Sequence, residues 1–363
     1  MDKQVQNKKI DLRSDTMSEP SADMLPDLAS LDYGVDVFGE NEQVNLLQNY
    51  AADLFGKPAA LLFPTGVMAN LAALIVHTPK GQEAIVGKSS HIFAHEGGNA
   101  SVLGGIPLKP VDDEGGIFDL NELAEAISDG AFFSTKTGLI CLENTHNDKA
   151  GIAHKPDALQ PIYQLAQQNN IPVHLDGARL LNACAKYDIA ANSFANCADS
   201  IMICLNKGVG APMGALLIGE TDFIEQAKGI RKLLGGSLNQ PSVMAHMALK
   251  GLQNYQAKLS VDNANAAKLV ELLSPYAQFD VKPTEQGTNI VYIFLRNPAK
   301  PATEYIPEFE KYGVHLLANQ IAYRAVFHSG VSAEDVEQIA QAFVEIFAVE
   351  HQGQQFVSTK EQG

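Results

Sequence analysis

The pattern of apolar and polar positions along this chain switches repeatedly between a helical period and short apolar runs. Residues 41–56 (NEQVNLLQNYAADLFG) carry apolar side chains at helical spacing and end at a glycine. An apolar run at 59–64, a helical stretch at 66–78 and another apolar run at 83–87 follow. Strands that alternate with helices of this length predict an α/β fold, in which helices cover both faces of a mostly parallel sheet.

The alternation continues to about residue 255 and then changes. The further apolar runs that predict strands are 138–145, 171–178, 199–207 and 214–219, and 156–170 predicts a helix. Beyond residue 255, a long helix precedes further β-rich runs, and an amphipathic helix at 332–349 closes the fold with Ser332 as its N-cap. We predict an N-terminal segment (1–40) at the active site and subunit interface, a large α/β domain (41–255), a small α+β domain (256–350) and a frayed polar tail (351–363).

Composition and charge narrow the class of protein. The 363 residues are 46% hydrophobic, which is enough for the cores of two domains. Asp and Glu number 42 against 26 Lys and Arg, giving a formal charge of -16 without any basic run, so nucleic acid and anionic membranes are poor partners. Four cysteines without CxxC spacing, and an amino terminus without an apolar leader, predict a reduced cytoplasmic protein with no disulfide or zinc framework.

A lysine stands in an unusual place within residues 201–214 (IMICLNKGVGAPMG). Lys207 follows the apolar run closely and precedes Gly208, Gly210 and Gly214. Burying an ammonium group costs free energy unless the group is paired or chemically changed. An amine that is removed from water gives up its proton more readily and can form a Schiff base with an aldehyde cofactor. We therefore expect Lys207 to bond a cofactor and the glycines to let the backbone pass close to it.

Two other strand ends carry groups that such a cofactor needs. Residues 64–66 (PTG) separate a strand from a helix, so Gly66 and the amide of Val67 can attract a phosphate, although an ordinary turn has the same sequence. Asp176 ends an apolar strand, where its carboxylate either anchors a cationic nitrogen or caps a helix. A phosphate turn, a strand-end Asp and a strand-end Lys, in this order, together predict pyridoxal phosphate.

Several motifs form a recognisable set. They are DLRSDT (11–16), YGVDVFGENEQVNLLQNYAADLFGK (33–57), PTGVMAN (64–70), LENTHN (142–147), HLDGAR (174–179), CLNKGVGAPMG (204–214) and RKLLGG (231–236). In these motifs the chain resembles the low-specificity L-threonine aldolases, within the β-eliminating lyase group of fold-type I pyridoxal-phosphate enzymes. The resemblance runs from residue 10 to about 250 and more weakly to the end. It implies a fold-type I transferase-like architecture with a smaller C-terminal domain.

The resemblance also implies a role for each matching residue. Lys207 carries the cofactor, Asp176 pairs with its pyridine nitrogen, and His91 stacks on its ring close to the substrate hydroxyl. The other residues expected at the cofactor are Gly66, Val67, Arg179, Asn206 and Lys232, and those expected at the substrate carboxylate are Ser14, Arg179 and Arg324. A homodimer or homotetramer is implied, in which Phe38 and Lys232 reach the site of the partner chain.

The chain departs from the family pattern at four positions. Val67 stands where a threonine hydroxyl is usual, Asn206 where a serine is common, and Asn239 where an arginine often contacts the phosphate. We expect the cofactor to bind nonetheless, though less tightly. Phe133 stands where a second active-site histidine often lies, which bears on the substrate and favours an aryl or branched side chain.

His95 offers a replacement for that missing histidine. It lies four residues after His91, so the two imidazoles share a face if the segment is helical. We hypothesise that His95 supplies a proton-transfer group near the β-carbon of the substrate; the alternative is a histidine at a subunit interface. The spacing also permits a pair of metal ligands, but no third ligand is evident, so we predict no metal site.

The predicted function is therefore that of a lyase. It uses pyridoxal phosphate to cleave a β-hydroxy-α-amino acid, threonine or allo-threonine or one with a bulkier side chain, into glycine and an aldehyde. β-Elimination or transamination on the same fold is one alternative, and a cofactor-binding protein without turnover is another. A nucleotide-dependent oxidoreductase is disfavoured, because the glycines after Lys207 do not open the first strand–helix unit.

Overall fold

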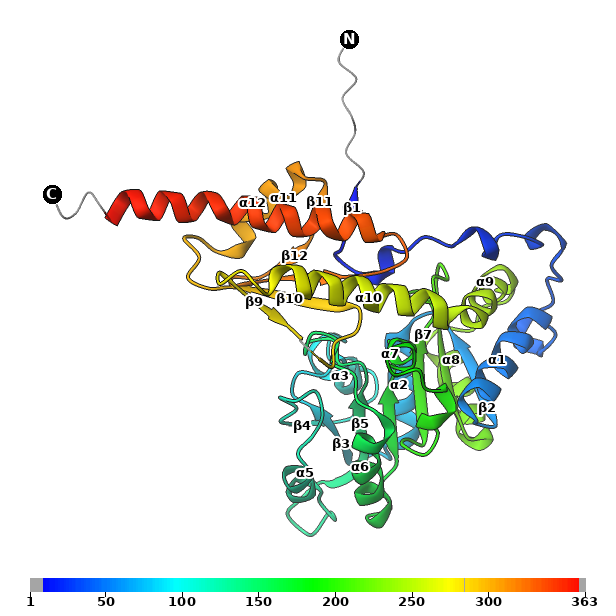
Figure 1. Ribbon diagram of the computed structural model, residues 1–363. Coiled ribbons are helices and arrows are strands. Elements are labelled where there is room, and N and C mark those ends of the chain that lie inside the picture. The colour runs from blue at the N-terminus through cyan, green and yellow to red at the C-terminus, as the bar shows by residue number, and fades with distance from the viewer. Residues whose placement is uncertain (1–8, 284, 359–363) are drawn as a thin grey trace.

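A computed structural model describes residues 9–283 and 285–358. Its largest feature is a seven-stranded sheet (Figure 1). In spatial order the strands are β2 (Ala59–Phe63), β8 (Ala215–Gly219), β7 (Ser200–Cys204), β6 (Val173–Asp176), β5 (Lys136–Glu143), β3 (Gln82–Gly87) and β4 (Leu108–Val111). β8 runs antiparallel to both neighbours, whereas the pairs from β7 to β4 are parallel. The predicted mostly parallel sheet is confirmed.

Helices cover both faces of this sheet, because successive strand residues point to opposite sides. Leu61 and Phe63 pack against one set of helices, which includes α2 and α8, while Leu62 packs against the other, which includes α1, α6, α7 and α9. The helices of this part are α1 (Glu42–Phe55), α2 (Gly66–His77), α3 (His91–Ala94), α4 (Asn99–Val102), α5 (Leu120–Ala126), α6 (Pro156–Gln168), α7 (Leu180–Tyr187), α8 (Thr221–Leu233) and α9 (Ser242–Gln253). Burial on both faces explains why the strands have continuous apolar sequences.

The predicted first helix is confirmed with both of its ends. Asn41 caps α1 by accepting a hydrogen bond from the amide of Val44, and Gly56 ends it in the left-handed conformation, φ 62°. Short 3-10 helices lie at Asp15–Met17, Ala22–Met24, Leu28–Ser30, Asp36–Phe38, Ala191–Phe194 and Ala302–Tyr305.

A second, antiparallel sheet lies in the C-terminal part (Figure 1). Its strands, in spatial order, are β12 (Leu317–Ala318), β13 (Ala322–Val326), β10 (Ile290–Leu295) and β9 (Phe279–Lys282), and its helices are α10 (Tyr255–Leu273), α11 (Ile306–Lys311) and α12 (Ala333–Ser358). α10 contacts β9, β10 and α12 at one end and α7 at the other. Its Leu259 belongs to the core of the large sheet and its Leu269 to the second core, so the predicted boundary at 255/256 falls at the start of a helix that both parts share.

The N-terminal segment joins the two parts. β1 (Ile10–Asp11) pairs in parallel with β11 (Val314–His315), and Ile10 and Leu12 are buried in the second core. The following residues return to the large sheet, where Ser18 Oγ donates a hydrogen bond to the carbonyl of Lys207. Residues 1–8 of the predicted segment 1–40 lie outside the described residues.

The last helix begins as predicted but ends later. Ser332 accepts from the amide of Asp335 and Asp335 accepts from the amide of Ser332, which forms a capping box. The predicted end near residue 349 is wrong, because α12 continues to Ser358. The added turns contain glutamines, which favour helix, and no proline. The rest of the predicted tail, residues 359–363, lies outside the described residues.

Two predictions from composition can be compared with the structure. Cys141, Cys184, Cys197 and Cys204 are buried and unpaired, as predicted. Burial raises the pKa of Cys184 to about 12, so this thiol stays protonated at neutral pH. None of the helices among the described residues has the length and apolarity that crossing a bilayer requires.

Candidate functional site

The ends of several strands meet at one edge of the large sheet. Asp176 ends β6 and pairs in parallel register with Met202 of β7, and Lys207 follows β7 closely. A cavity of about 190 Å³ lies at this edge. Its lining residues are Thr65, Gly66, Val67, Asn70, His91, Glu96, Asp176, Ala178, Met202, Cys204, Asn206 and Lys207. The structure thus brings together the predicted lysine, carboxylate, histidine and phosphate turn.

The amino terminus of α2 forms one wall of this cavity. Thr65 caps the helix by accepting a hydrogen bond from the amide of Met68. The amides of Gly66 and Val67 come too early in the helix to find an intrahelical acceptor, which makes this a favourable place for an anion. A Cβ on Gly66 would lie 2.9 Å from the sulfur of Cys204. The glycine therefore lets the helix end approach β7.

Polar groups below the cavity hold its carboxylate and imidazole in place. Asn70 donates to Asp176 and to Glu96, both at 2.8 Å, and the amide of Ala178 also donates to Asp176. His91 Nδ1 lies 3.0 Å from Glu96. Burial alone would lower the pKa of His91, but the hydrogen bond with Glu96 and the charges of Asp176, Glu96 and Glu143 outweigh it and raise this pKa. Asn70 and Glu96 were not predicted from sequence, although Asn70 lies within the PTGVMAN motif.

The glycines after Lys207 allow close packing and a tight turn. A Cβ on Gly208 would lie 2.3 Å from Leu259 of α10, and Gly210 and Gly214 have φ values of 84° and 112°. These glycines therefore allow close packing against α10 and the tight turn that returns the chain to β8. None of the three glycines is among the residues that line the cavity.

The two predicted arginines lie together but have different partners. Arg179 binds the buried carboxylate of Asp15 through Nε and Nη2, at 2.6 and 2.8 Å. Nη1 of Arg179 and Nη2 of Arg324 both donate to the amide oxygen of Asn147. Nε of Arg324 is buried without a hydrogen-bond partner. Burial and the neighbouring charge of Arg179 lower the pKa of Arg324, so this guanidinium is the one that an added anion would stabilise.

Ser14 and Asp15 illustrate what the sequence did not reveal. Ser14 was predicted at the substrate carboxylate, but its Oγ accepts from the amide and hydroxyl of Thr16 and caps the 3-10 helix there. Asp15, which was not predicted, neutralises Arg179, and that charge holds the pKa of Asp15 well below its usual value in spite of burial. Both residues belong to the DLRSDT motif, but no local pattern shows which side chain meets an arginine.

His95 is at the predicted position beside His91. The amide of His95 bonds to the carbonyl of His91 across one helical turn, and the two ring centroids lie 5.5 Å apart. His95 Nε2 lies 2.7 Å from a carboxylate oxygen of Asp148. His95 and Asp148 line a second, larger cavity of about 720 Å³, which extends to Tyr292 and Phe294 of β10.

Three predicted residues are not at the cavity within one chain. Phe38 and Phe133 are 75% and 96% exposed, and Lys232 is exposed near the end of α8. Phe133 precedes β5, so it lies at the edge of the sheet opposite Asp176. Any contact of these side chains with a site would have to involve a neighbouring subunit.

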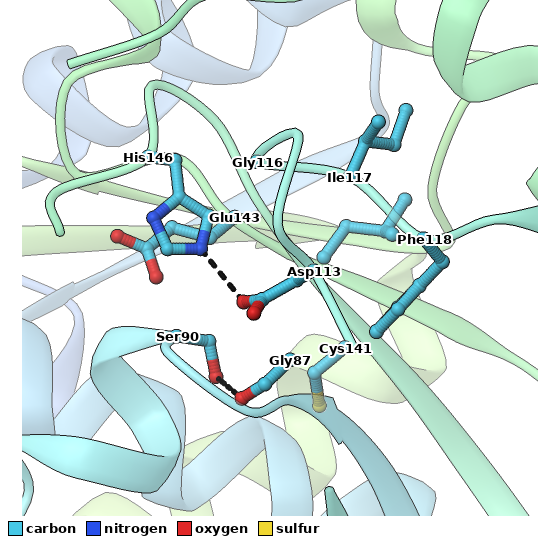
Figure 2. A pocket seen from close by; sticks show the side chains of 10 residues that line it. Gly87, Ser90, Asp113, Gly116, Ile117, Phe118, Cys141, Glu143 and His146 are labelled. Atoms are coloured by element: carbon cyan, nitrogen blue, oxygen red, sulfur yellow. Dashed lines mark hydrogen bonds and ion pairs between the residues drawn. The ribbon is translucent and has the colours of Figure 1, made fainter. Parts of the chain in front are cut away.

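The LENTHN segment (142–147) makes hydrogen bonds that hold residues next to the cavity in place. Glu143 accepts hydrogen bonds from the amides of His91 and Asn147, at 2.6 and 2.8 Å. Figure 2 shows the ring of His146 directed at Asp113, with Nε2 2.9 Å from the carboxylate. Burial would lower the pKa of His146, but Asp113 and the charge of Glu143 raise it. Glu143 therefore fixes the backbone of the cavity histidine and the backbone of Asn147, the residue whose side-chain oxygen the two arginines share.

Comparison with known proteins gives consistent matches over most of the chain. Residues 11–296 match the family model described as Beta-eliminating lyase. The chain is 37% identical over 332 residues to the low specificity L-threonine aldolase of Escherichia coli (strain K12), covering 91% of this chain and 97% of that one. It is 34% identical over 342 residues to low-specificity L-threonine aldolase 1 of Arabidopsis thaliana, covering 93% and 96%.

Among solved structures, a threonine aldolase from Leishmania major matches with a TM-score of 0.80. The sequences are 16% identical, and the match covers 93% of this chain and 99% of that chain. At this identity the likeness shows the fold, and it agrees with the predicted fold-type I architecture.

Proposed function

The chain belongs to the β-eliminating lyase family, and from that premise we propose that it is a pyridoxal-phosphate-dependent aldehyde-lyase. It cleaves a β-hydroxy-α-amino acid of the threonine type into glycine and an aldehyde. The observation that supports this most directly is that Lys207, Asp176 and His91 face one cavity beside a helix amino terminus.

The donor set of this cavity fits the functional groups of pyridoxal phosphate. Lys207 offers an amine to the aldehyde, Asp176 a carboxylate to the pyridine nitrogen, and His91 a ring to stack on. The amides of Gly66 and Val67 face the place for the phosphate, which Asn206 completes. When bound, the cofactor supplies an electron-accepting ring that stabilises negative charge on the α-carbon of the substrate.

The substrate carboxylate binds chiefly to Arg324. Its unpartnered Nε and the like charge of Arg179 both favour an anion at this point. Asn147 bridges the two guanidinium groups and holds them in register. Arg179 contributes through Nη1, because Asp15 binds its Nε and Nη2. We assign Ser14, the residue before Asp15, to the same substrate carboxylate. Anchoring the carboxylate orients the bond between the α- and β-carbons for cleavage.

His91 takes the proton of the substrate β-hydroxyl as that bond breaks. Its carboxylate partner Glu96 and its backbone partner Glu143 fix the ring in place. The raised pKa of His91 makes its imidazole a stronger base, which favours transfer of the hydroxyl proton to it.

His95 provides a second group for proton transfer. Asp148 orients its imidazole, and its side chain faces the larger cavity, which has room for a substrate side chain bulkier than the methyl of threonine. His95→Ala should lower kcat/KM by about tenfold or more, since a general acid–base group contributes at least this much. An unchanged kcat/KM would show that His95 does not act in the reaction.

The active form is a homo-oligomer of two or four chains in the cytoplasm. Phe38, Phe133 and Lys232 lie away from the cavity of their own chain, so we assign their role to the site of the neighbouring subunit. Lys232 then adds a positive charge at the phosphate. Phe133 adds an apolar wall on the substrate side, which favours aryl or branched side chains.

The same donor set allows other reactions of amino acids. β-Elimination would yield pyruvate and ammonia, and transamination would need a keto acid as second substrate. A binding protein would show the cofactor absorbance without turnover. Product analysis therefore distinguishes these alternatives from aldol cleavage.

The test uses purified full-length protein loaded with pyridoxal phosphate and a panel of β-hydroxy amino acids. We expect a visible absorbance band in the wild type, its loss in Lys207→Ala, and equimolar glycine and aldehyde from the wild type. Lys228→Ala, a change at an exposed lysine on α8, is the matched control and should behave as wild type. Pyruvate in place of glycine, or turnover that survives Lys207→Ala, would refute the proposal.

A further inference from the structure

A continuous line of hydrogen bonds runs beneath the cavity and ends at Asp176. It starts at His77, the last residue of α2, whose Nε2 lies 2.9 Å from Ser200 Oγ. Ser200 Oγ lies 2.8 Å from His174 Nδ1, and His174 Nε2 lies 3.0 Å from Asn70 Oδ1. Nδ2 of Asn70 then donates to Asp176 at 2.8 Å. His174, Ser200 and Asn70 are at most 1% exposed, so water does not compete for these bonds.

The charges at the cavity end decide how Asn70 is oriented. Its Nδ2 lies 2.8 Å from a carboxylate oxygen of Asp176 and equally far from one of Glu96. Turning the amide over would place its carbonyl oxygen against both carboxylates, with acceptors facing acceptors. The oxygen therefore faces His174, where an Nε2–H group is the partner that satisfies it.

This orientation fixes the protons along the rest of the line. Burial lowers the pKa of His174 to about 3 and that of His77 to about 4, so both rings are neutral and carry one proton each. With its proton on Nε2, His174 presents Nδ1 as an acceptor, and Ser200 must donate its hydroxyl there. Ser200 Oγ is then an acceptor for His77, whose proton also lies on Nε2. Every donor in the line points toward Asp176.

We propose that His174, Ser200 and His77 are positioning residues that hold the Asn70 amide with its N–H groups toward Asp176, so that this carboxylate stays fixed in place for the cofactor ring nitrogen. The inference rests on the proposed function in one respect, which is that Asp176 is the partner of that nitrogen. Donors that all point the same way polarise one another, which strengthens the last bond to the carboxylate.

The same amide also links the two groups that would contact the cofactor ring. Glu96, its second acceptor, is the hydrogen-bond partner of His91. A change of amide orientation would therefore disturb both the carboxylate and the stacking imidazole. The consequence for the enzyme is weaker cofactor binding and a changed cofactor spectrum rather than loss of the fold.

The first measurement concerns the protons themselves. In full-length protein labelled with ¹⁵N-histidine, long-range ¹⁵N–¹H spectra distinguish the two neutral tautomers and the charged ring, with and without cofactor. We expect His174 and His77 to be neutral with the proton on Nε2 at pH 6.5 to 8. A proton on Nδ1 of His174, or a charged His174 ring, would overturn the inference.

The second measurement separates positioning from mere packing. His174→Leu removes the donor to Asn70 and should raise the dissociation constant of pyridoxal phosphate about tenfold, the effect of losing one buried hydrogen bond. The ratio of visible to near-ultraviolet cofactor absorbance at a fixed pH should change as well. His174→Gln keeps an N–H donor and should restore both quantities toward wild type. His77→Leu and His77→Gln form a second, less buried pair with the same expected contrast.

Ser242→Ala is the matched control, because Ser242 is equally buried but bonds to Asn41. It should leave tautomers, dissociation constant and spectrum unchanged. The inference would also be overturned if the leucine variants fold and bind the cofactor with wild-type affinity and spectrum, whichever tautomers the wild type shows. A wild type with the expected tautomers that binds no pyridoxal phosphate would instead refute the proposed function, and with it the cofactor role assigned to this line.

Discussion

Arg179 and Arg324 share the amide oxygen of Asn147 but differ in their other bonds. Arg179 is a bidentate partner of the buried Asp15, whereas Arg324 keeps a buried Nε without a partner. A guanidinium that is already neutralised contributes mainly to the fold, and one that lacks an anion is available to a ligand. The two arginines have the same predicted role in the sequence, but they differ in how many of their N–H groups already have a hydrogen-bond partner.

We therefore expect Arg324→Gln to raise KM for the amino acid at least tenfold, because hydrogen bonds to charged groups contribute about 1.5–3 kcal/mol each. The free energy of unfolding should change little in comparison. Steady-state kinetics and denaturant unfolding measure the two effects. Arg296→Gln, at an exposed arginine after β10, is the control and should leave KM unchanged.

Arg179→Gln should affect the free energy of unfolding more than KM. Removing one partner of a buried ion pair costs about 3–5 kcal/mol of stability, because Asp15 is left buried and unpaired. A variant that unfolds at the wild-type denaturant concentration would contradict this assignment.

At the scale of elements, close packing between helices and the active-site loop holds Lys207 in place. α9 meets the loop after Lys207 at Gly251, where a Cβ would lie 2.5 Å from the carbonyl oxygen of Val209. α8 contains a glycine without such a neighbour, since no atom of the described residues, apart from chain neighbours and the helix's own backbone, lies within 4 Å of a Cβ on Gly229. Close packing therefore requires a glycine at position 251 but not at position 229, although both positions lie in amphipathic helices.

The two positions give opposite predictions for substitution by alanine. Gly229→Ala should stabilise the protein by about 0.5–1 kcal/mol, because alanine loses less backbone entropy in a helix. Gly251→Ala should destabilise it by about 1–3 kcal/mol through overpacking, and should weaken cofactor binding if the loop shifts. Denaturant unfolding measures both. Equal effects of the two changes would show that helix propensity, and not packing, dominates here.

For the molecule as a whole, buried neutral histidines tie stability to pH. The folded state keeps His77 and His174 neutral down to about pH 4 and 3, while the unfolded chain protonates them near 6.5. Between these limits the unfolded state binds more protons, so stability rises with pH in this window and is lost on acidification. Each group contributes a slope of up to about 1.4 kcal/mol per pH unit.

His77→Gln should therefore flatten the dependence of unfolding free energy on pH between 6.5 and 4. Chemical denaturation at several pH values and one protein concentration measures the slope. His315→Gln, at a half-buried histidine on β11, provides the comparison. A steeper slope in His77→Gln than in wild type would contradict the assignment of His77 as neutral.

The proposed assembly makes a prediction about mixed oligomers. Suppose that Lys232 completes the site of a neighbouring subunit. When Lys207→Ala and Lys232→Ala subunits are refolded together or allowed to exchange, each mixed dimer then contains one intact site. About a quarter of wild-type activity should return, because half of the dimers are mixed and each has one working site of two. Lys207→Ala mixed with Asp176→Ala should recover nothing, since each of these residues acts in its own chain.

Much of the architecture could be predicted because it depends on local patterns. The period of apolar residues located α1, α2, α6 and six of the seven strands of the large sheet, but it did not predict β4 (Leu108–Val111). Asn41 and Gly56 mark the two ends of the first helix. The end of α12 was predicted too early, because polar glutamines resemble a tail although they favour helix. The site was predicted where strand ends carry chemical groups, as with Asp176 and Lys207.

The sequence by itself determined the alternation of strands and helices, the positions of Asp176 at the end of one strand and of Lys207 shortly after another, and the family, because these depend on neighbours along the chain. Only the tertiary structure decided which carboxylate neutralises Arg179, why Gly208 must lack a side chain, and how His77 reaches Asp176 through Asn70. Those contacts join residues from different elements. Their partners depend on how strands and helices pack, and no local pattern of residues encodes that.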